Sequence, residues 1–196
     1  MKISLFPLNV VLFPEGELKL RIFEPRYVDM VSSCLRNNRG FGVCLTQEGK
    51  IMGKFADFFS MGTYAKIIDW DQMEDGFLGI VVKGEKRFRV HSHKSSKNNL
   101  CIGDVEWLSD DDNPMPVSYQ NFSDLLREIV VHYKLPIGKM TDRFDEANWV
   151  SERLAELLPF DLPVKQEILE MNSASHRFEY MEDLLKNIDS DKLIQS

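Results

Sequence analysis

The sequence predicts an α+β fold, in which a mostly antiparallel β-sheet or barrel with one inserted helix is followed by a helical unit. Apolar residues come in short, strand-length runs up to residue 109 and at helical spacing after residue 116. The net charge changes from +2 over residues 1–108 (15 basic, 13 acidic) to -9 over residues 109–196 (9 basic, 18 acidic). We therefore expect two units, residues 1–109 and 117–196, with a joint at residues 110–116 that is rich in aspartate and proline.

The first unit is predicted to contain most of the strands. Leu18, Leu20 and Ile22 recur at every second position, which is typical of a half-buried strand. Glycine reaches positive φ without a Cβ penalty, so residues 75–76 and 83–86, each containing a glycine, are predicted turns. The other predicted strands are residues 41–45, 64–70, 77–82, 87–91 and 101–107.

One helix is predicted inside this first unit, over residues 25–38. Tyr27, Val28, Val31 and Leu35 lie at helical spacing. Pro25 suits the first helical turn, and the polar residues 37–40 supply a stop.

The second unit is predicted to be helical throughout. Its apolar residues form four stripes, and each stripe is interrupted by proline or by a helix-capping residue. Pro136 separates the first two helices, Pro159 ends the second, Pro163 opens the third, and Asn172 or Ser173 can cap the fourth. The stripes are residues 122–130, 147–158, 168–171 and 178–188.

Composition excludes several classes of protein. With 43% hydrophobic and 28% charged residues, the chain is not disordered or collagen-like. Three cysteines do not make a disulfide scaffold. No apolar run approaches the roughly 18 residues that span a bilayer, and residues 1–7 do not resemble a signal peptide. We expect a cytoplasmic protein without contact to a membrane.

No catalytic residue, cofactor or metal site is predicted. The chain lacks a G-x-x-x-x-G-K-[ST] phosphate loop and the G-x-S-x-G, H-E-x-x-H and G-x-G-x-x-G motifs. Cys34, Cys44 and Cys101 lie far apart among apolar neighbours, as core cysteines do. His91 and His93 have the spacing of two metal ligands on one strand face, but no third ligand is indicated, so a solvated strand end is the better interpretation.

A basic stretch, residues 83–97, could contact nucleic acid. It contains six basic residues and one acid, with Phe88 interleaved. Arg87 and Arg89 are expected on one face and Phe88 and Val90 on the other, which is the ordinary pattern of a half-buried strand. The net charge of -7 also opposes a polyanion. The sequence argues against nucleic acid as a partner.

Two groups of residues are candidates for contact with a partner. Arg21, Glu24, Arg26 and Asp29 surround the turn into the predicted first helix, beside Phe23 and Tyr27. They either pair locally near the helix N-terminus or form a charged lip that grips a peptide. Phe58 and Phe59 are adjacent, and two neighbouring strand residues cannot both face one core. One of them should point outward unless the helical unit covers it.

Six short segments, in order along nearly the whole chain, carry a resemblance to one family. They are residues 6–16 (FPLNVVLFPEG), 18–27 (LKLRIFEPRY), 62–67 (GTYAKI), 84–90 (GEKRFRV), 154–159 (LAELLP) and 164–170 (VKQEILE). Together they resemble the Lon N-terminal (substrate-binding) domain family, including its free-standing members. Residues 6–16 are similar to the opening signature of that domain, and residues 18–27 to the segment that follows it.

The resemblance implies a PUA-like antiparallel β-barrel unit followed by a C-terminal helical bundle. It also implies a non-catalytic module that binds unfolded or tagged protein segments, and it suggests an adaptor for an ATP-dependent protease. The chain has no counterpart of the ATPase and Ser–Lys protease domains of Lon. The expected polypeptide-binding residues are Phe23, Glu24, Arg26, Tyr27, Phe58 and Phe59. The alternative is a PUA-like module for RNA or a small ligand, because a fold does not fix a function.

Overall fold

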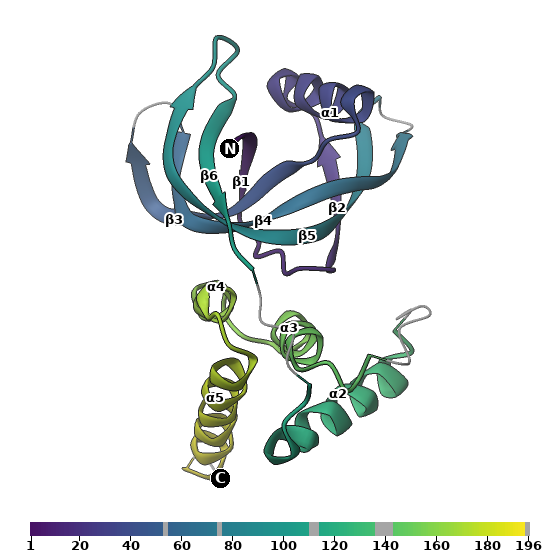
Figure 1. Ribbon diagram of the computed structural model, residues 1–196, viewed down its shortest axis with the longest axis vertical. Helices are drawn as coiled ribbons and strands as arrows, with labels where there is room; N and C mark the ends of the chain where they lie inside the picture. Colours follow the sequence, from purple (N-terminus) through teal and green to yellow (C-terminus); the bar gives the residue numbers. More distant parts are fainter. Residues whose placement is uncertain (53–54, 74–75, 110–113, 136–142, 195–196) are drawn as a thin grey trace. The chain divides into compact units, whose positions relative to one another are not determined.

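The computed structural model describes residues 1–52, 55–73, 76–109, 114–135 and 143–194 (Figure 1). Within these residues the structure is mixed α+β, with a six-stranded sheet and five α-helices. The chain divides into two compact units, Met1–Ser109 and Asp110–Ser196. The first unit contains the whole sheet and one helix, and the second contains the other four.

The strands of the first unit form one sheet, in which the last strand in the order pairs back with the second. The order of pairing is β2–β5–β4–β3–β1–β6, and β6 pairs in addition with β5. All pairs are antiparallel except β1 with β3, which is parallel. The strands are β1 (Lys2–Leu8), β2 (Glu17–Ile22), β3 (Phe41–Met52), β4 (Phe55–Gln72), β5 (Leu78–Ser95) and β6 (Cys101–Trp107).

Two different strands share one edge of β5. Residues 78–83 of β5 pair with β2, whereas residues 88–95 pair with β6. On its other side, β6 pairs with β1, but only along residues 2–5 of that strand. Of the two strands on this edge of β5, only β6 is paired with β1, and β2 is an outermost strand of the sheet.

The predicted turn at residues 83–86 is wrong, because β5 runs through it as a single strand of 18 residues. Gly84 does not have the positive φ that a tight turn needs. Its N–H donates to the Gly16 carbonyl (2.9 Å) and its carbonyl accepts from the Glu15 N–H (2.8 Å). A Cβ on Gly84 would lie 2.3 Å from the Phe13 carbonyl oxygen. Glycine is therefore needed here because it lets the backbone at Phe13 lie close to β5. The turn at Gly76 is confirmed by its φ of 84°, while Asp75 lies outside the described residues.

The predicted helix in the first unit is confirmed as α1 (Pro25–Asn37). Pro25 occupies the first turn, where the N–H groups have no acceptor within the helix, so the N–H that proline lacks is not needed. Asn38 ends the helix in the left-handed conformation (φ 48°), and its N–H bonds back to the last turn. The buried face consists of Tyr27, Met30, Val31 and Cys34.

Two hydrophobic clusters fill the first unit. The larger one joins the buried face of α1 to the strands, with Phe6, Leu12, Ile22, Phe41, Val43, Ala65, Ile80, Val82 and Leu100 among its members. The smaller one consists of Ile3, Leu5, Cys44, Phe88, Cys101 and Val105. Because members of each cluster are far apart in the sequence, the core depends on the strand pairing being complete.

The predicted helices of the second unit are confirmed in order. They are α2 (Gln120–Tyr133), α3 (Ala147–Leu157), α4 (Leu162–Glu170) and α5 (Ala174–Ile194), preceded by a short 3₁₀ turn, η1 (Val117–Tyr119). Pro163 lies in the first turn of α4, and Ser173 directly precedes α5. Of the predicted inner face of α5, Phe178 and Met181 are buried, while the side chain of Ile188 lies outside the described residues, as do residues 136–138.

None of the described helices combines the length and the apolar character that crossing a membrane requires.

Candidate functional site

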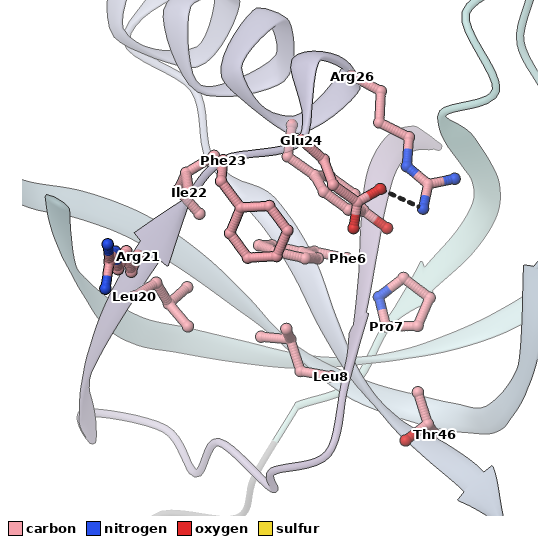
Figure 2. Close-up of a pocket in the computed structure, with 11 residues that line it drawn as sticks. Phe6, Pro7, Leu8, Leu20, Arg21, Ile22, Phe23, Glu24, Arg26 and Thr46 are labelled. Carbon is pink, nitrogen blue, oxygen red and sulfur yellow. Dashed lines mark ion pairs between the residues drawn. The ribbon is translucent and has the colours of Figure 1, made fainter. Parts of the chain in front are cut away.

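A cavity of about 300 Å³ lies in the first unit, between the end of β1, the end of β2 and the start of α1 (Figure 2). This volume is at the lower end of the range for sites that hold small ligands. Its lining combines apolar side chains with three charged ones, and Thr46 of β3 completes it. The lining residues are Phe6, Pro7, Leu8, Leu20, Arg21, Ile22, Phe23, Glu24, Arg26, Tyr27 and Thr46.

The short connection from β2 to α1 places the charged and aromatic rim. β2 ends at Ile22 and α1 begins at Pro25, so only Phe23 and Glu24 join them. Glu24 is extended (φ -76°, ψ 129°), and its carbonyl accepts the Tyr27 N–H (2.9 Å), which starts the helix. With Ile22 directed into the core, Phe23 is left 63% exposed.

Aromatic side chains form both the floor and the rim. Phe6 and Tyr27 are buried and stacked, with ring centroids 3.9 Å apart and planes inclined by 26°. On the rim, the Phe23 ring meets the Phe77 ring edge-on, with centroids 6.1 Å apart. The Arg21 guanidinium carbon lies 4.6 Å from the centre of the same Phe77 ring. The rim therefore presents a cluster of exposed aromatic surface beside an apolar hollow.

Arg26 is held by several groups at once. Its Nη2 lies 2.7 Å from Glu24 Oε2, and its Nη1 donates to the Asn99 carbonyl (3.1 Å). Its guanidinium carbon is 4.8 Å from the centre of the Tyr27 ring. Burial raises the pKa of the Tyr27 hydroxyl, and the positive charge of Arg26 opposes that shift. Glu24 and Arg26 thus pair locally, which is one of the two roles expected for them; their contact with a polypeptide stays a prediction.

The structure brings together four of the six residues expected to bind polypeptide. Phe23, Glu24, Arg26 and Tyr27 line the cavity, within one stretch of five residues. Phe58 and Phe59 lie on β4 and do not line it. Phe58 packs against the smaller core cluster and against the His93 ring (centroids 5.0 Å apart), and Phe59 is half-buried.

Sequence reasoning missed the strand that forms the far wall. Residues 2–8 were not expected to be a strand, so Pro7 and Leu8 were not candidates. Pro7 lies opposite Cys44 of β3 and beyond residues 2–5, the part of β1 that pairs with β6, so its missing N–H removes no hydrogen bond to β6. Leu20 could have been found from the alternation in residues 18–22, which assigns it to the inner face.

A second, more open hollow is lined by residues of β2, β4 and β5. Its volume is about 440 Å³, and it shares Leu20 and Arg21 with the first cavity. Trp70 (57% exposed) and Met73 (40% exposed) contribute apolar surface to it. The complete lining is Lys19, Leu20, Arg21, Asp69, Trp70, Asp71, Met73, Gly79, Ile80 and Val81.

In the basic stretch at residues 83–97, the alternation predicts Arg87 and Arg89 on the exposed face of a half-buried strand, and that prediction is wrong for Arg87. Arg87 is fully buried, whereas Arg89 is exposed, so the two arginines do not present a shared surface. Lys83 lies 3.3 Å from the Glu15 carboxylate, which neutralises part of the remaining charge. This arrangement weakens the case for contact with phosphates.

No group of three or more histidine, cysteine or acidic side chains within the described residues is placed to hold a metal ion. His91 pairs with Glu106 (Nε2 to Oε2, 3.1 Å), and both side chains are more than half exposed. The His93 ring packs against the Phe58 ring instead, with the two planes inclined by 50°.

The first cavity offers apolar contact, aromatic stacking and charge at its rim.

Comparison with known proteins gives a consistent result. The model of the ATP-dependent protease La (LON) substrate-binding domain matches residues 2–187. The chain is 26% identical to Lon protease 1 of Bdellovibrio bacteriovorus over 172 residues, which are 83% of this chain and 21% of that protein. It is 22% identical to Lon protease of Escherichia coli, over 95% of this chain and 25% of that protein. The chain thus spans about a quarter or less of these relatives.

Solved structures agree with this match. The crystal structure of the Lon N-terminal domain protein from Xanthomonas campestris superposes with a TM-score of 0.77 and 32% identity, covering 95% of this chain and 98% of that one. The N-terminal domain of the Mycobacterium avium complex Lon protease superposes with a TM-score of 0.71 over 93% of this chain and 97% of that one. At 13% identity, the second likeness shows the fold alone.

Proposed function

This chain belongs to the family of the ATP-dependent protease La (LON) substrate-binding domain, and from that premise we propose that it is a non-catalytic module that binds unfolded or tagged protein segments. We also propose that it acts as an adaptor for proteolysis, presenting these segments to an ATP-dependent protease. The family's chain-long match supports the substrate class, and the cavity between β1, β2 and α1 is the proposed contact surface.

The observation that carries this proposal is the apolar cavity with its exposed aromatic rim. Phe23 is 63% exposed and Phe77 is 37% exposed, and they lie edge to face beside the hollow. Exposed aromatic side chains next to a hollow are typical of sites that bury apolar groups of a partner. An unfolded chain exposes such groups, whereas a folded protein has buried most of its own.

Finer features of the fold belong to the same proposal. We infer that the closed pairing of β5, β4, β3, β1 and β6 is a PUA-like barrel, and that α2 to α5 form a bundle. We keep the division into a β unit, residues 1–109, and a helical unit, residues 117–196, as functional domains. We expect the protein in the cytoplasm, where ATP-dependent proteases encounter unfolded proteins. We also expect it to bind without a cofactor.

The RNA alternative has no observation in its favour. Arg87, at the centre of the basic stretch, is fully buried and does not reach a phosphate. The remaining exposed lysines and arginines are a common property of strand surfaces. Salt dependence separates the two functions, because binding to a polyanion releases counterions and weakens steeply with salt.

Fluorescence anisotropy with a permanently unfolded, labelled polypeptide tests the proposal. The folded form of that polypeptide and an RNA oligonucleotide are the ligand controls. We expect preference for the unfolded chain, with little change between low and moderate salt. Salt-sensitive binding of RNA without binding of the polypeptide would contradict the proposal.

A matched pair of variants locates the surface. Phe23→Ala should weaken binding of the unfolded polypeptide about fivefold or more, as loss of an interface aromatic does. Leu35→Ala removes another exposed apolar side chain (40% exposed), on α1 and outside the cavity, and should leave binding unchanged. Equal effects of the two substitutions would place the binding surface elsewhere.

A further inference from the structure

The cavity is bordered by the backbone edge of β2, and not only by one of its faces. Three consecutive residues of β2, residues 20–22, line it, and the lining continues through Phe23 and Glu24. Successive side chains of a strand point to opposite faces, so a consecutive run of lining residues means that the main chain itself borders the space. Figure 2 shows Leu20 directed toward the cavity and Arg21 on the other side of the strand.

This edge of β2 is not occupied by another described strand. β2 pairs with β5 alone among the strands that the structure describes. In an antiparallel pair, alternate residues turn their N–H and C=O groups away from the partner. An outermost strand therefore presents a row of donors and acceptors, which is a template for a further strand.

The neighbouring strand leaves room at the same place. β6 stands between β5 and β1 over residues 2–5 of β1, and β1 residues 6–8 extend beyond that pairing. These three residues line the cavity opposite residues 20–23. The cavity is therefore bordered by residues of β1 that do not pair with β6 and by the edge of β2 that no described strand pairs with.

The side chains of β2 indicate which sequence such a strand would carry. Leu18, Leu20 and Ile22 face the core side, and Lys19 and Arg21 are exposed on the other face. Asp69 and Asp71 of β4 lie on that outer face too, but β5 separates them from β2. Val81 of β5 pairs with both Lys19 and Asp69, and Gly79 pairs with both Arg21 and Asp71. The two basic side chains are therefore nearer to the edge than the two acids, and an added strand would meet positive charge first.

We propose that an extended polypeptide with alternating apolar and acidic residues binds by adding a strand to the edge of β2. Its apolar side chains enter the cavity beside Leu20 and Phe23, and its acidic side chains lie next to Lys19 and Arg21. Main-chain hydrogen bonds supply sequence-independent affinity, and the alternation supplies preference. This inference rests on the proposed function, since it specifies how the polypeptide is recognised.

Backbone pairing is tested with short synthetic peptides that alternate glutamate with leucine or phenylalanine. Two N-methylated versions carry the methyl groups on the odd or on the even residues, so each blocks one edge of the peptide and leaves its side chains intact. We expect one version to bind about tenfold more weakly or worse and the other to bind like the parent. Hydrogen exchange of the amides of residues 17–22 should slow when the parent peptide binds.

Charge preference is tested by reversal. The variant Lys19→Glu with Arg21→Glu should bind the glutamate peptide about tenfold more weakly and prefer a lysine version, as two cross-strand pairs change sign. Arg36→Glu with Arg39→Glu makes the same change in net charge at the other end of α1, on exposed residues outside the cavity, and should keep the original preference.

The outcomes separate this inference from the proposed function. If the unfolded polypeptide binds but both N-methylated peptides bind like the parent, strand addition is overturned and polypeptide recognition stands. The same holds if no short peptide binds. It also holds if ultracentrifugation shows that the chain forms a dimer and hydrogen exchange shows that this dimer, without peptide, protects the β2 amides. If the unfolded polypeptide also fails to bind, both proposals fall.

Discussion

Arg177 is 1% exposed, and it connects three segments of the helical unit. Its Nε donates to Ser151 Oγ (2.9 Å) and its Nη2 to Asn148 Oδ1 (2.6 Å), both on α3. Its Nη1 donates to the Met171 carbonyl (2.9 Å), between α4 and α5. A buried guanidinium is tolerated when its donors are satisfied in this way.

Replacing Arg177 should therefore destabilise the helical unit. Arg177→Leu leaves the buried Ser151 hydroxyl and the half-buried acceptors of Asn148 and Met171 without this donor, so we expect the free energy of unfolding to fall by about 3 kcal/mol. Urea denaturation followed by circular dichroism measures the loss. Lys186→Leu, at a side chain that is 63% exposed, should change stability by less than about 0.5 kcal/mol. Similar losses of stability in the two variants would show that Arg177 does not stabilise the helical unit in this way.

At the scale of elements, the length of β5 is the feature that organises the first unit. Because the strand continues for 18 residues, β2 and β6 can pair with its two halves along one edge. Gly84 lies between these halves, in contact with the segment that leads into β2. The same residue therefore keeps β5 continuous and admits the backbone of residues 13–16 alongside it.

Gly84→Ala should thus destabilise the sheet. The new methyl group would meet the Phe13 carbonyl oxygen at 2.3 Å, and the backbone must move to relieve the overlap. We expect a loss of about 1–3 kcal/mol in the free energy of unfolding, in the range of overpacked cores. Gly76→Ala meets no atom within 4 Å but has a φ of 84°, so it should show only the smaller penalty of a left-handed alanine, about 1 kcal/mol. Equal stability of wild type and Gly84→Ala would contradict this account.

At the scale of the whole molecule, the three cysteines report on the packing of the first unit. Cys34 belongs to the larger core cluster, and Cys44 and Cys101 belong to the smaller one. All three thiols are buried and free. Burial raises the pKa of Cys34 and Cys44, and it raises the pKa of Cys101 from its ordinary 9.0 to about 11.

Native thiols should therefore react slowly with a thiol reagent such as DTNB at pH 8. A thiol of ordinary pKa is about one-tenth thiolate at that pH, and one with a pKa near 11 is about one-thousandth thiolate. Since the folded pKa values are raised, the thiol form stabilises the fold below pH 9, and this stability is lost as pH rises toward 11 and above. Unfolding in guanidinium should expose three fast-reacting thiols per chain. Rapid reaction of the native protein would contradict the buried placement.

One wall of the candidate site could be predicted from the local sequence, and the opposite wall could not. The stretch from Phe23 to Tyr27 stood out because apolar and charged residues meet at a helix start marked by Pro25. The opposite wall, from Phe6 to Leu8, did not, because a strand with a proline in it lacks a clear period. Whether Phe58 and Phe59 contact a partner stays a prediction.

The α+β class, the first helix (predicted over residues 25–38 and observed over 25–37), the order of the later helices and the family could all be predicted from the sequence. These follow from periodicity, capping residues and motifs, which act over a few residues at a time. The continuity of β5, the burial of Arg87 and the cavity between β1 and β2 emerge from the three-dimensional packing alone. Burial and pairing depend on which distant segments pack together, and a local pattern fits more than one such arrangement.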